Sequence, residues 1–88
     1  SIRYTDDHIL DYMEVDASHA IFEVEVPEEW TGKTVGELDI RKRYNINILA
    51  VKNDREFNIA ISPDTCFAEN NKLLVLGEYK NLQKCFRI

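Results

Sequence analysis

A short basic segment, residues 39–48, requires the chain to change from helix to strand within a few residues. Three consecutive cations, Arg41, Lys42 and Arg43, occupy one helical turn. Asn45 follows where a helix C-terminus takes a residue with positive φ, a conformation that Asn tolerates better than most residues. An apolar strand begins directly afterwards. The segment therefore predicts a basic loop between two ordered elements, with backbone N–H groups at the strand start that are free to meet an anion.

Runs of apolar residues predict a mainly antiparallel sheet. Strands are expected over residues 20–26, 47–52, 56–61 and 72–77. The first alternates apolar and acidic residues, as a half-buried strand does, whereas residues 47–52 are almost continuously apolar and are expected to lie centrally. Asn53-Asp54 and Asn70-Asn71 are typical turn pairs, and both are expected to connect antiparallel neighbours.

Three helical segments are expected around this sheet. Thr5 is a candidate N-cap, and apolar residues at helical spacing follow it, which predicts a helix within residues 1–15. Thr34 and Glu37 match a capping box and predict one short helix that continues towards Ile40. A last helix is expected from Tyr79 onward. The fold class is therefore α+β, with a small antiparallel sheet and flanking helices.

The charges are divided unevenly along the chain. Residues 1–39 contain eleven acidic and two basic side chains, whereas residues 40–88 contain five acidic and nine basic ones. Such a distribution argues against a nucleic-acid-binding surface, which needs basic residues over most of one face. It permits a focused anion site in the second half. The alternative for Arg41 to Arg43 is a solvated helix face.

Catalytic and metal-binding chemistry have little support. No nucleophile–base spacing, zinc motif or Gly-rich phosphate loop is present, so no catalytic residue, metal site or cofactor is predicted. Glu23 and Glu25 are expected on a solvated strand face. Cys66 and Cys85 lack a CxxC spacing and are interpreted as reduced thiols, with a disulfide as the alternative.

The length of the chain limits the number of domains it can form. Its 88 residues form one small domain, which a dimer partner would stabilise. No run is long and apolar enough for a membrane span, and no signal-peptide pattern is present. Because the sequence begins at Ser1, we expect it to be part of a longer protein.

Four segments resemble the C-terminal subdomain of RCK regulators, the TrkA-C domain. They are residues 35–41 (Val-Gly-Glu-Leu-Asp-Ile-Arg), residues 44–52 (Tyr-Asn-Ile-Asn-Ile-Leu-Ala-Val-Lys), Ser62-Pro63 and residues 73–77 (Leu-Leu-Val-Leu-Gly). Residues 9–15 also look like the cytosolic regulatory subunit of Ktr-type bacterial potassium-uptake systems. The family often has Gly at Asn45 and Gly-Asp at Asn70-Asn71, turn positions that Asn can also serve. The resemblance implies a helical lead-in over residues 1–15 and a TrkA-C domain over residues 16–88.

The resemblance also implies a function. Members of this family regulate a membrane potassium transporter from the cytoplasm, peripheral to the inner face of the membrane. They have an N-terminal RCK domain, which is absent here, and they form homodimers. Ktr-type members bind cyclic di-AMP across the dimer axis. By match, the ligand would contact residues from both chains: Ile40, Arg41, Lys42, Asn47, Ile48 and Pro63.

The residue types fit this ligand. Arg41 can hold a phosphate with its planar fork and Asn47 can donate hydrogen bonds, while the apolar members can cover adenine faces. Two alternatives remain. The residues can simply build a dimer interface in a ligand-free module, or the module can belong to another transporter, such as an antiporter, or to a transcription regulator.

Overall fold

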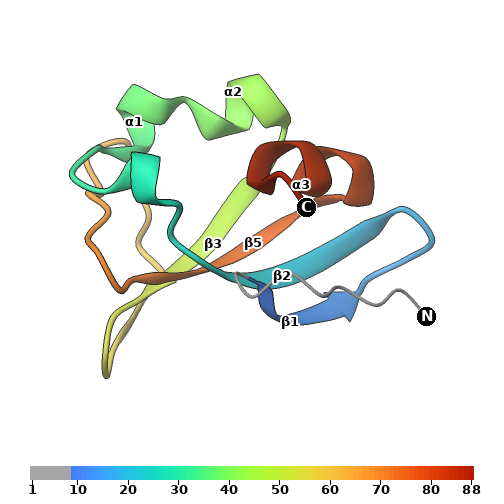
Figure 1. Ribbon diagram of the computed structural model, residues 1–88, viewed down its shortest axis with the longest axis horizontal. Helices are drawn as coiled ribbons and strands as arrows, with labels where there is room; N and C mark the ends of the chain where they lie inside the picture. The colour runs from blue at the N-terminus through green and yellow to red at the C-terminus, as the bar shows by residue number, and fades with distance from the viewer. Residues whose placement is uncertain (1–8) are drawn as a thin grey trace.

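The computed structural model describes residues 9–88, which form a five-stranded antiparallel sheet with helices on one side (Figure 1). The strands lie in the order β1-β2-β5-β3-β4. The elements, in chain order, are β1 (Ile9–Glu14), β2 (His19–Glu25), the 3-10 helix η1 (Glu28–Trp30), α1 (Val35–Leu38), α2 (Ile40–Tyr44), β3 (Asn47–Lys52), β4 (Phe57–Asn58), β5 (Lys72–Glu78) and α3 (Tyr79–Phe86). The predicted α+β class with a small antiparallel sheet is confirmed.

The core lies between the helices and one face of the sheet. Alternate residues of β2 and β5 supply its centre, as the alternation predicts: Ala20, Phe22, Val24, Leu73 and Val75 are all buried. Leu82 of α3 is fully buried against them. The Phe22 ring meets the rings of Tyr12 and Tyr79 edge-on, at centroid distances of 6.2 and 6.3 Å. Aromatic edge contacts of this kind stabilise a core beyond the burial of their area.

The helix predicted near the N-terminus is wrong from Ile9 onward, where the chain forms β1; Thr5 lies outside the described residues. The register against β2 shifts between Ile9 and Asp11, so that Ile9 pairs with Val24 and Tyr12 pairs with Phe22. This irregularity places Ile9 and Tyr12, three residues apart, on the same face. A strand with such a bulge imitates helical spacing in the sequence.

The predicted hairpin partner of β3 is shorter than expected. The sequence predicts a strand over residues 56–61, but only Phe57 and Asn58 pair with β3. The turn before them is built by the Asn53 side chain, whose Oδ1 accepts the N–H groups of Arg55 and Glu56, at 3.2 and 3.1 Å. The Asn58 side chain then accepts the N–H of Ala60 at 3.1 Å. Side-chain bonds of this type compete with a ladder and end the strand.

The capping box at the start of α1 is confirmed. Thr34 Oγ1 accepts the Glu37 N–H at 3.1 Å, and Glu37 Oε1 accepts the Thr34 N–H at 3.1 Å. These two bonds satisfy N–H groups that a helix start otherwise leaves free.

Replacing Thr34 with alanine should lower the free energy of unfolding by about 1 kcal/mol, because the Glu37 N–H loses its acceptor. Urea denaturation followed by circular dichroism measures this change. Thr31→Ala is the control, since Thr31 is exposed and its side chain makes no hydrogen bond among residues 9–88. Equal midpoints for the two variants would contradict the prediction.

Candidate functional site

The basic segment forms α2, a five-residue helix bounded on both sides by left-handed residues. Asn45 has φ 56°, as predicted, and its N–H donates to the Arg41 carbonyl at 2.9 Å. Asp39 also lies in the left-handed region, at φ 51°, a conformation that was not predicted from the sequence. The one short helix expected from Thr34 is therefore two helices, α1 and α2, with a break at Asp39.

The three cations of α2 differ in their surroundings. Arg43 is exposed, as expected for a solvated helix face, and its guanidinium also donates to the Leu38 carbonyl at 3.4 Å and to the Tyr44 hydroxyl at 3.3 Å. It also lies 5.2 Å from the centre of the Tyr44 ring, within the range of a cation–π contact. Arg41 and Lys42 are exposed, and neither makes a side-chain hydrogen bond or ion pair within the described range. These two cations are therefore available to an anion.

Ile40 does not present its side chain on the protomer surface. It is 2% exposed and belongs to the hydrophobic core together with Leu38 and Ile46. The left-handed turn at Asp39 restarts the helix with Ile40 directed inward. The expected contact between the Ile40 side chain and an adenine is therefore corrected: this side chain is buried and anchors α2 in the core. The exposed residue next to it is Arg41.

The other predicted residues flank α2 on two different segments. Asn47 is exposed at the start of β3, where it pairs with Leu76, and Ile48 is half-buried against the core. Pro63 is exposed in the loop between β4 and β5. The structure thus joins Arg41, Lys42, Asn47 and Ile48 through one continuous helix-to-strand passage, and Pro63 comes from a separate loop.

Gly36 fixes the position of this loop and was missed in the sequence. Its N–H donates to the Pro63 carbonyl at 2.9 Å, and a Cβ at Gly36 would lie only 3.0 Å from that oxygen. The neighbouring Val35 N–H donates to the Thr65 carbonyl at 2.9 Å. The glycine inside the Thr-Val-Gly-Glu helix start was the available signal. Glycine weakens a helix, so its presence there indicates that another backbone segment approaches closely.

No three His, Cys, Asp or Glu side chains of residues 9–88 lie together in a way that could hold a metal ion. Helices in this range are all too short or too polar to cross a membrane. Cys66 is exposed and Cys85 is half-buried, and both are free thiols, which confirms that they are unpaired. Burial raises the pKa of the Cys85 thiol to about 12, against the opposing effect of Arg43.

The two cysteines should react at different rates with iodoacetamide. At about pH 8 we expect a single modification, on Cys66, because the thiolate is the nucleophile and burial suppresses it at Cys85. Intact mass and peptide mapping measure the site and stoichiometry. In urea both thiols should react. Equal rates in the folded protein would show that Cys85 is more accessible than its burial indicates.

A family model for the TrkA-C domain matches residues 19–88, which include every element from β2 to α3. The chain belongs to the TrkA-C domain family. The match covers α2, β3 and the loop with Pro63, so all six residues of the candidate site lie inside the family domain. The division of the chain at residues 15 and 16 remains a prediction, and β1 belongs to the same sheet as the matched residues.

Two curated relatives come from Bacillus subtilis (strain 168). The Ktr system potassium uptake protein C is 29% identical over 77 residues, which is 88% of this chain and 35% of that protein. The K(+)/H(+) antiporter subunit KhtT is 36% identical over 64 residues, 72% of this chain and 39% of that protein. This TrkA-C chain therefore spans little more than a third of either relative.

A solved structure agrees with the fold. The RCK C domain of the potassium transport protein KtrA, in complex with cyclic diadenosine monophosphate, superposes with a TM-score of 0.74 at 32% identity. The superposition covers 78% of this chain and 81% of that one. The resemblance inferred from the sequence motifs is thereby confirmed at the level of the family and the fold.

Proposed function

We propose that this TrkA-C domain is the ligand-sensing regulatory part of a potassium transporter and binds cyclic di-AMP. The observation that carries the proposal is the similarity to the KtrA RCK C domain in its cyclic di-AMP complex, at 32% identity and a TM-score of 0.74. The exposed side chains of Arg41 and Lys42, which have no hydrogen bond or ion pair to residues 9–88, support it, because a dinucleotide with two phosphates needs cations that are not already paired.

Each residue of the proposed pocket has a distinct role. Arg41 holds a phosphate with two parallel N–H donors, and Lys42 adds a mobile point charge. Asn47 supplies amide hydrogen bonds at the start of β3. Ile48 and Pro63 cover the adenine with apolar surface. Ile40 contributes from beneath, by fixing α2 in the core.

The ligand and the protein are proposed to share one two-fold axis. Cyclic di-AMP has two equivalent halves, so a homodimer offers each half the same residues. Such a dimer would cover exposed apolar surface. Ile40 adds nothing to this surface because it is buried, whereas four large apolar side chains are more than half exposed: Met13, Val15, Phe57 and Ile59.

The proposed setting follows from the resemblance to Ktr-type regulatory subunits. The complete protein would carry an N-terminal RCK domain and contact a membrane transporter subunit, in the cytoplasm and peripheral to the inner face of the membrane. No nucleic acid is involved, and no reaction is catalysed. Bound ligand would lower potassium uptake by favouring one of two dimer arrangements, since a ligand shifts an equilibrium only through different affinities for the two states.

Calorimetric titration with cyclic di-AMP tests the proposal, with AMP and ATP as controls. We expect saturable binding of one cyclic di-AMP per two chains and much weaker binding of either control. Sedimentation equilibrium of the same sample should give the mass of a dimer. A dimer without binding would favour the ligand-free dimerisation module, and absence of both would contradict the proposal.

The second candidate places the same domain in an antiporter. The observation that favours it is the identity of 36% to the antiporter subunit KhtT, over a region that includes most of this chain. Co-purification of the complete protein with its membrane partner, followed by ion-flux measurement in vesicles, distinguishes uptake from exchange.

A further inference from the structure

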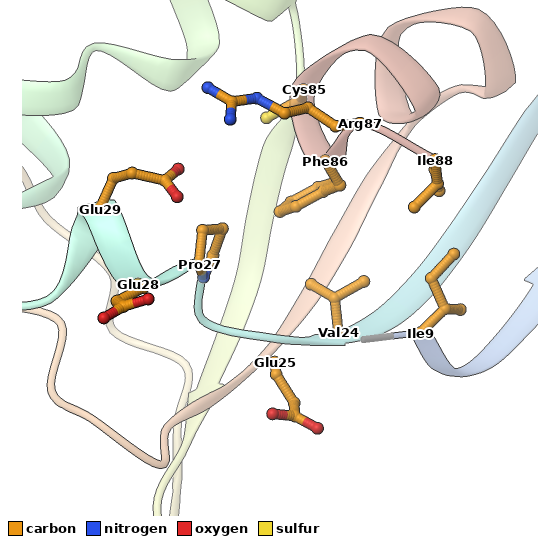
Figure 2. Close-up of a pocket in the computed structure, with 10 residues that line it drawn as sticks. All are labelled: Ile9, Val24, Glu25, Pro27, Glu28, Glu29, Cys85, Phe86, Arg87 and Ile88. Atoms are coloured by element: carbon orange, nitrogen blue, oxygen red, sulfur yellow. The ribbon is translucent and has the colours of Figure 1, made fainter. Parts of the chain in front are cut away.

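A concave surface lies where β2, η1 and the end of α3 meet (Figure 2). Its volume is about 260 Å³. The lining combines apolar walls with a charged rim: Ile9, Val24, Pro27, Phe86, Ile88 and Cys85 form the walls, and Glu25, Glu28, Glu29 and Arg87 form the rim. We call this surface the β2–α3 groove. None of its lining residues belongs to the proposed cyclic di-AMP pocket.

The walls of the groove rest on the core. Val24 is 1% exposed, and Phe86 packs against Trp30 with their ring centroids 5.5 Å apart. Trp30 is itself buried and contacts Phe67 on its other side, also at 5.5 Å. Ile88 is held at the helix end, where its N–H donates to the Gln83 carbonyl at 3.0 Å. The groove is therefore a preformed apolar surface.

The rim carries more negative than positive charge. Glu25, Glu28 and Glu29 are exposed, and Figure 2 shows Glu28 and Glu29 on one side with Arg87 across from them. None of these four side chains has a hydrogen bond or ion pair in the described part of the chain. The C-terminal end of α3 adds the partial negative charge of its carbonyl groups. The groove therefore favours a ligand that has an apolar group for the walls and neighbouring cations for the acidic rim.

We propose that the β2–α3 groove docks a basic peptide segment of a partner protein. One large aliphatic side chain of that segment fills the cavity, and lysine or arginine side chains next to it face Glu28 and Glu29. The acidic rim supports this choice, because lysine or arginine side chains complement its exposed carboxylates, and a cavity of about 260 Å³ has room for one large aliphatic anchor side chain. Exposed carboxylates contribute little individually, so the apolar anchor supplies most of the affinity and the charges select the sequence.

The docking requires neither cyclic di-AMP nor dimerisation, and it can be tested on the 88-residue chain as it stands. The probe is a synthetic peptide of about twelve residues, made of lysine and leucine at helical spacing. Trp30 is the only tryptophan of the chain and touches Phe86, so its fluorescence reports occupation of the groove. Backbone amide spectra then locate the binding.

We expect a saturable change in Trp30 fluorescence and amide shifts confined to residues around Val24, Glu25, Phe86 and Ile88. The double variant Glu28→Gln/Glu29→Gln should weaken binding about threefold or more at low salt, since each exposed charge contributes a few tenths to 1 kcal/mol. Arg87→Gln should tighten it. Glu56→Gln/Glu69→Gln is the matched control, because both residues are exposed and outside the groove, and it should leave the affinity unchanged.

A peptide with glutamate in place of lysine should bind at least several-fold more weakly, because its charges repel the acidic rim. Absence of any fluorescence change with the basic peptide would overturn the proposal. So would amide shifts located elsewhere on the sheet, or equal weakening by the two double variants, because each would show non-specific attraction to an acidic protein.

Discussion

Arg41→Ala should weaken the binding of cyclic di-AMP by more than about tenfold, because a hydrogen bond to a charged group contributes about 1.5–3 kcal/mol and a two-fold site loses two of them. Arg41 is exposed, and its side chain has no partner among residues 9–88, so its removal disturbs no other contact. The melting temperature and the dimer mass should stay nearly unchanged. Calorimetric titration of the purified variant measures the loss.

The choice of control follows from the structure. Arg43 is unsuitable, since its guanidinium is bonded to Leu38 and Tyr44 and its loss would loosen α2. Arg55 is exposed on the β3–β4 turn, and replacing it with alanine removes the same charge as Arg41→Ala does. Arg55→Ala should change the affinity less than about twofold, as expected for a screened distant charge. Similar losses for Arg41→Ala and Arg55→Ala would mean that general charge, and not a contact at α2, attracts the ligand.

Ile40→Ala should lower the free energy of unfolding by about 2–5 kcal/mol, the range for removing a buried aliphatic side chain. The side chain is 2% exposed, so the substitution leaves a cavity beneath α2. In a domain of this length the melting temperature should fall by roughly 10 °C or more. Thermal unfolding followed by circular dichroism measures the shift.

The same variant separates a supporting role of Ile40 from direct contact with the ligand. Ile40→Val should cost only about 0.5–1.5 kcal/mol and should retain cyclic di-AMP binding, because α2 stays anchored. If Ile40→Ala lowered the affinity while its stability stayed that of the unaltered protein, Ile40 would be a surface contact. That result would contradict its burial.

The sheet was predictable where each strand keeps a simple period. The alternation through Phe22 and Val24 identified β2, and the capping pair Thr34 and Glu37 located α1. β1 was not predictable because its bulge between Ile9 and Asp11 breaks the two-residue period. The break at Asp39 was equally hidden, since Asp adopts the left-handed conformation only occasionally and its weak helix propensity does not by itself mark a helix end.

The candidate site was predictable in its charges but not in its orientation. The cluster of cations is visible in the sequence, whereas the difference between Arg41 and Arg43 depends on the position of Tyr44 and the Leu38 carbonyl. The approach of Pro63 to α1 depends on Gly36. This is a long-range backbone contact, and the glycine is the single feature of the sequence that indicates it.

The left-handed conformation of Asp39 limits which sequences can keep this geometry. A β-branched residue there would meet a steric penalty of roughly 1–2 kcal/mol and would favour a continuous helix through residues 35–44. Such a helix would direct Arg41 and Lys42 differently relative to Pro63 and would expose Ile40. Mutational tolerance at position 39 should therefore be restricted to Gly, Asn and Asp, although the residue touches neither the core nor, in our proposal, the ligand. A saturation library at this position, sorted first for folding and then for cyclic di-AMP binding, would separate variants that fold from those that still present their cations correctly.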